Sequence, residues 1–198
     1  GKIDQIGEGE AAFYGPKIDF QATTLLGKEE SIGTVQLDFQ GAINFDLKYV
    51  GADGEEHRPY IFHRAPLSTH ERFLSFLIEH LGGAFPTWLA PIQARIIPVR
   101  DDCLEYCNDI VRELRSQLIR AEVDLTDNSF NKKIREAVTH KIPNIVIVGN
   151  KEVENSTVTL RRYCMEKQVA MPRVDFIARM HKLCTQRTMD NFADVVVD

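Results

Sequence analysis

Apolar and polar residues alternate along the first half of the chain in a way that predicts strands. Residues 34–39 place an apolar side chain at every second position, and residues 45–50 do so again. A turn is expected at residues 51–54, and a third strand at Pro59–His63, because proline is tolerated at the first residue of a strand. Short turns between alternating strands indicate an antiparallel sheet.

A helix is expected after this sheet, from about Thr69 to Leu81. Phe73 and Leu77 lie on one face at helical spacing, and a pair of glycines follows directly. The pattern then changes, because strands alternate with helices in the second half. The expected order is strand 94–99, helix 104–118, strand 123–125, helix 131–140, strand 145–148, strand 157–161 and helix 174–183.

Alternating strands and helices imply a parallel or mixed sheet that is covered on both faces. The predicted fold class is therefore α+β. An antiparallel sheet with one helix occupies residues 1–93, and an α/β domain with a mixed sheet occupies residues 94–198.

The composition is that of an ordinary soluble globular protein, with 43% apolar and 27% charged residues. No apolar run approaches the roughly 20 residues that a membrane-spanning helix needs, and the start shows no secretory signal pattern. The chain begins with Gly1 rather than Met, which agrees with a processed fragment or a piece of a longer protein.

Charge is divided unevenly between the two halves. Residues 1–93 hold 7 Lys and Arg against 13 Asp and Glu, net −6, whereas residues 94–198 hold 17 against 16, net +1. A local basic patch can hold phosphates even in an acidic protein, and a solvated helix face is the equally open alternative. The clustered basic residues are Lys132, Lys133, Arg135, Lys141, Lys151, Arg161 and Arg162.

The four cysteines form no CxxC pair. Cys103 and Cys107 are four residues apart on an expected helix, a spacing that can suit a metal. No histidine lies near enough in the sequence to complete such a site, so buried packing is the favoured interpretation. Nothing demands an oxidising compartment, and the predicted location is the cytosol.

The segment Pro59–Gln93 carries the most specific motif of the chain, PYIFHRAPLSTHERFLSFLIEHLGGAFPTWLAPIQ. Its strand ends in His-Arg, crosses a small-residue turn and enters a helix with Glu-Arg near its start, which resembles motif 3 of class II aminoacyl-tRNA synthetases. The upstream pieces AAFYGPKIDF at Ala11–Phe20 and GTVQLDFQ at Gly33–Gln40 occur in the same order as in threonyl-tRNA synthetases. The second half resembles the anticodon-binding domain that the enzymes for threonine, proline, histidine and glycine share.

This resemblance implies an enzyme that activates threonine with ATP and Mg²⁺ and transfers it to tRNA-Thr, as a homodimer without membrane attachment. Such a site works by positioning and electrostatics, and a planar, permanently charged guanidinium such as that of Arg72 suits ATP. The resemblance assigns catalytic roles to Lys17, Gln36 and Arg72, and threonine or ATP binding to Tyr14, Thr34, Gln36, Thr69 and Arg72.

His63 corresponds to the histidine that the family uses as one of three protein ligands to a catalytic zinc. Zinc accepts nitrogen and oxygen ligands, and catalytic sites leave a position open for substrate. The other two ligands, a Cys and a His in the family, are expected upstream of Gly1. For a histidine in a strand, a satisfied core residue is the alternative interpretation.

Two residues depart from the family pattern near ATP. Ser31 stands where glutamine is common, and Ser68 stands in the motif 3 turn where glycine is usual. A side chain at residue 68 is expected to crowd a close approach of the backbone, while Thr69 still offers a hydroxyl.

The resemblance also assigns anticodon contacts to Arg135, Glu152 and Arg161. A glutamate only accepts hydrogen bonds, so Glu152 suits an amino or imino group of a base, and a solvated turn residue is the alternative. Two further contact positions, commonly Asn and Lys, are Asp127 and Ser129 here, and each change removes a donor.

The sequence therefore predicts the C-terminal portion of a threonyl-tRNA synthetase, without motifs 1 and 2. The isolated chain is expected to be inactive, because two zinc ligands and the motif 2 arginine are missing from it. A non-catalytic RNA-binding module derived from a synthetase is the alternative. A different class IIa synthetase is disfavoured by the HRA motif together with FYGPK.

Overall fold

The structure is a computed structural model that describes residues 6–163 and 165–190. The chain divides into two compact units, residues 1–80 and 81–198. Residues 81–93 pack with the second unit, and the predicted functional boundary after Gln93 stays a prediction. None of the helices in the described residues is long and apolar enough to cross a membrane.

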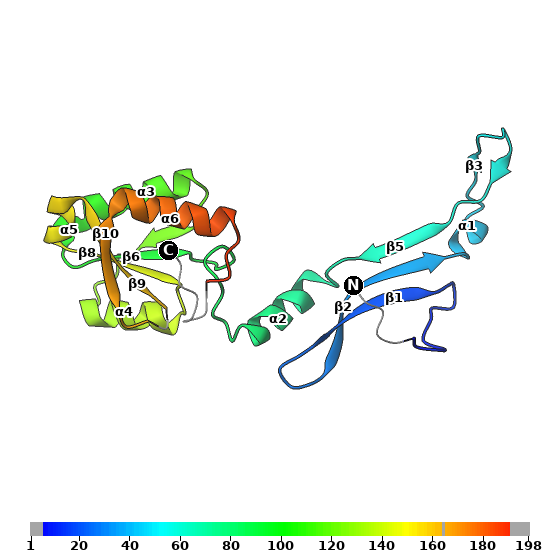
Figure 1. Cartoon of the computed structure of the whole chain (residues 1–198), viewed down its shortest axis with the longest axis horizontal. Helices are drawn as coiled ribbons and strands as arrows, with labels where there is room; N and C mark the ends of the chain where they lie inside the picture. The colour runs from blue at the N-terminus through cyan, green and yellow to red at the C-terminus, as the bar shows by residue number, and fades with distance from the viewer. Residues whose placement is uncertain (1–5, 164, 191–198) are drawn as a thin grey trace. The chain divides into compact units, whose positions relative to one another are not determined.

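The first unit is built on a three-stranded sheet in the order β1-β2-β5 (Figure 1). These strands are β1 at Lys17–Thr23, β2 at Glu29–Asp38 and β5 at Ile61–Ala65. Both pairings are antiparallel, as the alternating pattern predicted. The helix α2 follows at His70–His80, close to its expected bounds, and Gly82 and Gly83 after it adopt positive φ angles.

The strand predicted at residues 45–50 is wrong. Backbone N–H groups of Gln40 and Gly41 donate to the Asp38 carboxylate at 2.8 Å each, and this turn leads into the short helix α1 at Gly41–Asn44. Only β3, Tyr49–Val50, is extended, and it pairs with β4, Glu56–His57, across the turn expected at residues 51–54. Backbone N–H groups of residues 45–47 donate to carbonyls of α1, so this part of the alternating segment closes a helix instead of pairing as a strand.

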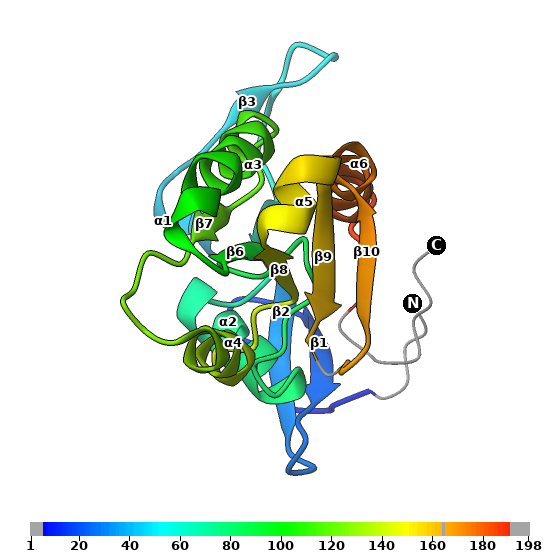
Figure 2. The same cartoon turned by 90° about the vertical axis from the view of Figure 1, so that its left-hand side faces the viewer.

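The second unit contains a five-stranded mixed sheet in the order β10-β9-β8-β6-β7, which Figure 2 shows with β10 at the right. β6 is parallel to β7 and β8, and β9 is antiparallel to β8 and β10. The strands are β6 Ala94–Pro98, β7 Ala121–Val123, β8 Asn144–Val148, β9 Thr157–Arg162 and β10 Gln168–Pro172. The helices are the 3-10 helix η1 Asp101–Cys103, α3 Leu104–Ser116, α4 Phe130–Thr139, α5 Asn150–Asn155 and α6 Arg173–Thr185.

Helices cover both faces of this sheet, as predicted. Figure 1 shows α3 and α6 on one face and α4 on the other. Successive residues of a strand point to opposite faces, so Ile96 belongs to the core under α3 and α6, while Ile97 belongs to the core under α4. The apolar run of β8 is buried throughout because it contributes to both cores.

Several boundaries differ from the pattern. α3 ends at Ser116, so Leu118 adopts a positive φ of 61° and is 89% exposed instead of continuing the apolar stripe. The strand expected at residues 123–125 forms two residues earlier as β7. The pattern did not predict α5 or β10, and β10 is an edge strand whose residues are mostly exposed.

Cys103 and Cys107 are packed in the core beneath α3, and burial raises the pKa of the Cys107 thiol to about 12. The described residues contain no group of three or more potential ligands that could hold a metal ion. Cys184 is partly buried and accepts a hydrogen bond from Gln93. Cys164 lies outside the described residues.

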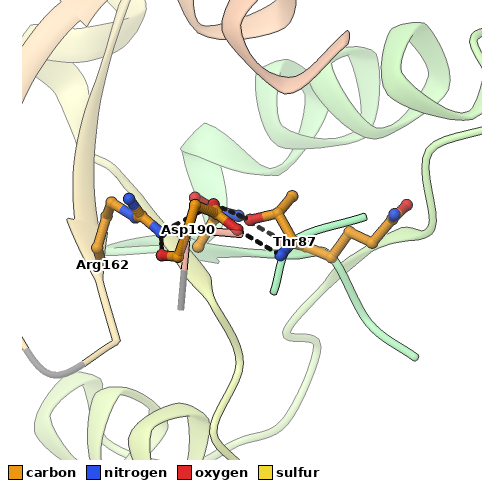
Figure 3. Close-up of polar contacts among 5 residues, drawn as sticks. Thr87, Arg162 and Asp190 are labelled. Carbon is orange, nitrogen blue, oxygen red and sulfur yellow. Dashed lines mark hydrogen bonds and ion pairs between the residues drawn. The ribbon is translucent and has the colours of Figure 1, made fainter. Parts of the chain in front are cut away.

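A buried polar cluster joins the two ends of the second unit (Figure 3). The Asp190 carboxylate accepts hydrogen bonds from the backbone N–H and the hydroxyl of Thr87, both at 2.7 Å, and pairs with Arg162 at 2.8 Å. Asn144 donates to the Thr87 hydroxyl at 2.8 Å. Thr87 lies 103 positions before Asp190, so the cluster fixes the segment before β6 against the segment after α6.

Candidate functional site

One face of the first sheet brings together three of the predicted site residues. Lys17 on β1 is the register partner of Gln36 on β2, and Gln36 is the partner of His63 on β5. The three side chains therefore form a row across the sheet, because directly paired residues share a face. The opposite face carries apolar partners such as Leu37 and Phe62.

Tyr14 reaches the same row from the segment before β1. The backbone at Gly15 approaches β2 so closely that a Cβ there would lie 2.0 Å from the carbonyl oxygen of Leu37, which requires glycine. This approach is fixed by a hydrogen bond from Phe39 N to the Tyr14 carbonyl at 3.0 Å. The Tyr14 hydroxyl donates to the Gln36 side-chain oxygen, and the Tyr14 ring lies 5.8 Å from the His63 ring.

His63 is half exposed, with 50% of its side chain accessible, and its Nε2 lies 2.9 Å from Asp38 Oδ2. Asp38 is two residues beyond Gln36 on β2, on the same face. The hydrogen bond with His63 lowers the pKa of the Asp38 carboxyl, and the backbone N–H groups of Gly41 and Gln40 lower it further. The sequence motifs assign no role to Asp38.

Lys17 is paired with a carboxylate on its own strand. Its Nζ lies 2.7 Å from Asp19 Oδ2, and this hydrogen bond raises the pKa of Lys17 and lowers that of Asp19. Asp19 is in turn the register partner of Thr34. Thr34 thus lies one pleat from Gln36 on the polar face, next to the charged pair.

Arg72 lies in the first turn of α2 and pairs with Glu30 of β2 at 3.4 Å. Thr69 accepts a hydrogen bond from the Arg72 backbone N–H at 3.3 Å, so its hydroxyl caps the helix. Ser68 adopts φ 54°, a left-handed conformation that favours glycine. The turn therefore keeps a geometry suited to glycine even though a serine occupies it.

Arg72 is not adjacent to His63. Glu30 and Gln36 are six positions apart on β2, which corresponds to about 20 Å along a strand, and the β-bulge between them gives Glu30 the partner Ala22 on the other face of β1 from Lys17. His63, Tyr14 and Gln36 thus lie together near one end of β2, and Arg72 lies by Glu30 near its other end. Both side chains of the Arg72–Glu30 pair are exposed, at 55% and 40%, so the pair is easily separated.

Ser31, the other departure, contacts a glutamine from the neighbouring strand. Gln21 of β1 pairs in register with Ser31, and its amide donates to the Ser31 hydroxyl at 2.8 Å. The sheet has a β-bulge directly before this pair, between Phe20 and Gln21. A glutamine side chain therefore lies beside position 31 although the residue itself is serine.

In the second unit, Glu152 and Arg161 are brought to neighbouring positions. Glu152 lies in the first turn of α5, where Oε2 accepts from the backbone N–H of Gly149 and Oε1 accepts from the Thr159 hydroxyl, both at 2.9 Å. Thr159 and Arg161 share a face of β9. The alternative of a solvated turn residue is therefore wrong for Glu152, which is half-buried and helical.

Arg161 faces away from the core under α3 and α6. Its strand neighbours Val158 and Leu160 belong to that core, and the register partners of Arg161 on the other face are Ile145 and Gln168. The Nε atom of Arg161 is buried and has no hydrogen-bond partner among the residues that the structure describes. This guanidinium is therefore not consumed by an internal ion pair.

The remaining predicted RNA contacts lie at α4 and the loop before it. Arg135 is exposed on α4, and Ser129 precedes that helix without forming a side-chain cap. Asp127 borders a polar hollow of about 300 Å³ that Arg100 and Lys133 also line. The hollow lies beyond the carboxyl ends of the parallel strands β6 and β7, where α/β sheets commonly bind ligands.

Not all of the basic cluster is available for a ligand. Arg162 is only 12% exposed and pairs with Asp190, and burial lowers the pKa of its guanidinium while Asp190 opposes this effect. Lys133 donates to the backbone of Asp124, and Lys141 donates to the backbone of Gly82. Arg162 is thus an internal group, and the two lysines are each engaged by a backbone carbonyl of the same unit, which the sequence does not reveal.

Two sequence families match the chain. The family described as tRNA synthetase class II core domain (G, H, P, S and T) matches residues 2–81, and the family described as Anticodon binding domain matches residues 93–183. Among solved structures, the RNA binding domain of threonyl-tRNA synthetase from Cryptosporidium parvum is similar, with a TM-score of 0.77 and 34% identity over 87% of this chain and 44% of that chain.

Curated relatives agree with both matches. The threonine–tRNA ligase of Ligilactobacillus salivarius is 53% identical over 170 residues, which are 85% of this chain and 26% of the relative. That of Oceanobacillus iheyensis is 54% identical over 157 residues, which are 79% of this chain and 24% of the relative. The chain thus spans about a quarter of the length of the curated relatives. It therefore belongs to the threonyl-tRNA synthetase family of class II aminoacyl-tRNA synthetases, as the end of the class II core followed by an anticodon-binding domain.

Proposed function

We propose that this chain is the C-terminal part of a threonine–tRNA ligase. The whole enzyme joins threonine to ATP, releases pyrophosphate and transfers threonine to tRNA-Thr, in the cytosol and as a homodimer. The observation that carries the proposal is the row of Lys17, Gln36 and His63 across one polar sheet face, with Tyr14 bonded to Gln36. The relatives supply the reaction that such a face would serve.

The two ends of β2 would have different tasks. Tyr14, Gln36 and Thr34 would line the threonine site, where a hydroxyl and an amide can orient a small polar substrate. Arg72 would leave Glu30 and lie against ATP with its Mg²⁺, and Thr69 would fix the start of its helix. Lys17 would place positive charge near the reacting phosphate. Holding both substrates in one geometry supplies most of the catalysis in such a reaction.

His63 fits the role of a zinc ligand. One ring nitrogen is engaged with Asp38, half of the side chain is exposed, and within the described residues no hydrogen bond uses Nδ1. A zinc ion here would accept the amino and hydroxyl groups of threonine, and a site that requires the hydroxyl rejects valine. His63 would hold the ion together with a Cys and a His supplied by the rest of the enzyme.

The second unit would bind the anticodon. Among the residues that the structure describes, Arg161 Nε has no hydrogen-bond partner, and Glu152 keeps acceptor capacity beyond its two internal bonds. Arg135 would add an exposed charge from α4 for the phosphate backbone. Because Asp127 and Ser129 offer fewer donors than the usual Asn and Lys, contacts at the loop before α4 would differ from those of the family.

The first prediction concerns activity of the isolated chain. Threonine-dependent exchange between ATP and pyrophosphate is expected to be absent in residues 1–198 and present in the complete enzyme. In the complete enzyme, Arg72→Ala is expected to lower kcat about 100- to 1000-fold, the effect of removing one charge-stabilising donor. Arg112→Ala is the control, since Arg112 forms only an exposed ion pair on α3. Exchange catalysed by the isolated chain would contradict the proposal.

The second prediction separates the enzyme from a non-catalytic RNA-binding module. Arg161→Ala is expected to weaken binding of tRNA-Thr to residues 1–198. A contact between Arg161 and a phosphate predicts that the slope of log affinity against log salt concentration falls by about one in this variant. Changing the anticodon of the tRNA is expected to weaken binding to unaltered protein, by about 1–3 kcal/mol for each base that the protein reads and that is replaced. Filter binding at several salt concentrations measures both.

Arg112→Ala again serves as the control in the binding measurement, because it removes the same charge from an exposed position on α3. Equal affinity for tRNA-Thr and for a tRNA with an altered anticodon would favour the alternative of a general RNA-binding module. The serines at residues 31 and 68 are the only sequence features that support that alternative.

A further inference from the structure

Asp38 is a buried carboxylate that the proposed chemistry does not use directly. We propose that Asp38 is the positioning residue for His63, holding the imidazole ring in one orientation with its proton on Nε2 and the lone pair of Nδ1 free for a metal ion. The inference rests on the proposed function of His63 as a zinc ligand. It concerns a residue outside the ligand set.

The position of the Asp38 side chain is fixed by its other oxygen. Oδ1 accepts two backbone hydrogen bonds, from Gln40 and Gly41, at 2.8 Å each. The Asp38 side chain is only 11% exposed, so few water molecules can compete for these two hydrogen bonds. Oδ2 is thereby directed to His63 Nε2 at 2.9 Å. A carboxylate that is itself immobilised can immobilise the ring that it contacts.

The contact also determines where the imidazole proton lies. A carboxylate accepts hydrogen bonds, and Asp38 already accepts two backbone N–H groups on Oδ1, so His63 Nε2 is the donor to Oδ2. A neutral imidazole with a proton on Nε2 has its lone pair on Nδ1. Histidines that bind metals generally donate their other N–H to a carboxylate or carbonyl, which fixes the tautomer and orients the ring.

A purely structural role for Asp38, holding the turn between β2 and α1, is the competing explanation. Asp38→Asn separates the two. The amide oxygen of asparagine would stay with the N–H groups of Gln40 and Gly41, so the turn would be kept. The amide NH₂ would then face His63 Nε2, which would have to accept, and the proton would move to Nδ1 and occupy the position of the metal. Asp38→Ala would instead lose the turn and leave the ring free.

The chain offers a matched control in the β3–β4 hairpin. His57 Nε2 lies 2.8 and 3.0 Å from the two oxygens of Asp53, and Asp53 also accepts a backbone bond from Glu55. Both side chains of that pair are about half exposed, at 43% and 54%. Asp53→Asn is therefore the same chemical change at a histidine with no proposed metal role.

The test is the Zn²⁺ dissociation constant of the complete synthetase that contains this chain, measured by competition with a coloured chelator and accompanied by the thermal midpoint. His63→Ala is expected to abolish binding at this site. Asp38→Asn is expected to weaken Zn²⁺ binding about 10- to 100-fold, the range found for partners of metal-binding histidines. It should weaken binding at least as much as Asp38→Ala while lowering the thermal midpoint less. Asp53→Asn should change neither quantity.

The outcomes distinguish the proposed role of Asp38 from the proposed metal role of His63. Zinc that is lost in His63→Ala but bound normally in Asp38→Asn would overturn the inference about Asp38 and leave the metal role of His63 intact. Weaker binding in Asp38→Ala alone, parallel to its loss of stability, would assign Asp38 to the turn. An unaltered enzyme that binds no zinc would overturn the metal role of His63, and the inference with it.

Discussion

Residues 81–198 produced alone are expected to unfold in one cooperative transition, whereas residues 1–80 produced alone are expected to show none. The reason is the distribution of buried apolar side chains. Both hydrophobic cores of the described residues lie in the second unit, and Ala42 is the only apolar residue in residues 6–80 that is buried. Burial of apolar surface is the main term that offsets the entropy of ordering a chain.

The first unit leaves its apolar sheet face open. Phe20 and Phe62 are 54% and 67% exposed, and no residue of α2 is buried. A three-stranded sheet needs a hydrophobic face covered by another element to be stable by itself. The contribution of this unit to the stability of the chain is therefore expected to be small.

Urea denaturation followed by circular dichroism measures the transition of each piece. For residues 81–198 a slope of about 1–3 kcal/mol per molar urea is expected, as for small cooperative domains. Hydrogen exchange in residues 1–198 is the internal check, since β6 and β8 should be protected while β1, β2 and β5 exchange rapidly. A cooperative transition in residues 1–80 would contradict this interpretation.

Asp190→Ala is expected to destabilise the second unit by about 3–5 kcal/mol, the cost of removing one partner from a buried ion pair. Asp190 is 1% exposed and the Arg162 side chain 12% exposed, so the substitution leaves a guanidinium without its carboxylate in the interior. It also leaves the N–H and hydroxyl of Thr87 without their acceptor. A loss of this size is a large part of the stability of a small domain.

The control for this variant is Asp109→Ala. Asp109 pairs with Arg112 on α3 at 2.9 Å, but the two side chains are 39% and 78% exposed. Exposed pairs contribute at most about 1 kcal/mol, so this variant is expected to unfold at nearly the same urea concentration as the unaltered chain. Equal stability losses in the two variants would mean that the cluster of Thr87, Arg162 and Asp190 does not fasten the ends of the unit.

Periodicity predicted most elements of the second unit because one or both faces of each are buried. α3 begins at its expected residue, and β8 was expected within one residue of its observed start. In such segments the buried positions must be apolar, so the spacing of apolar residues in the sequence follows the spacing of buried positions in the structure. The two-faced core of the mixed sheet follows from the same pattern, since strands between helices read as continuous apolar runs.

The prediction failed where local hydrogen bonds, the end of a helix or an edge position in the sheet determines the backbone conformation. Residues 45–47, the start of the strand expected at residues 45–50, instead donate backbone hydrogen bonds to the carbonyls of α1 and close that helix. Leu118 continues an apolar repeat but lies beyond the end of α3. β10 pairs on one side only and is mostly exposed, so burial gives its sequence no clear alternation.

The motifs identified the candidate site residues one by one, but only strand register brings Lys17, Gln36 and His63 into a row. The two pairings join residues 19 and 27 positions apart, Lys17 with Gln36 and Gln36 with His63, which no local pattern contains. The same applies to Asp38, whose partner His63 is 25 positions away.

Arg161 and Arg162 show most clearly what the sequence by itself determines about this protein and what it leaves to the tertiary structure. The sequence predicts a strand that ends at Arg161, and the structure extends it by one residue, so that Arg161 and Arg162 point to opposite faces. The sequence does not determine which one is internal. That depends on Asp190, which returns from beyond α6 to pair with Arg162 and leaves Arg161 on the face without an internal ion pair. A charge enters a protein interior only where a partner compensates its desolvation, and here the partner is supplied by folding.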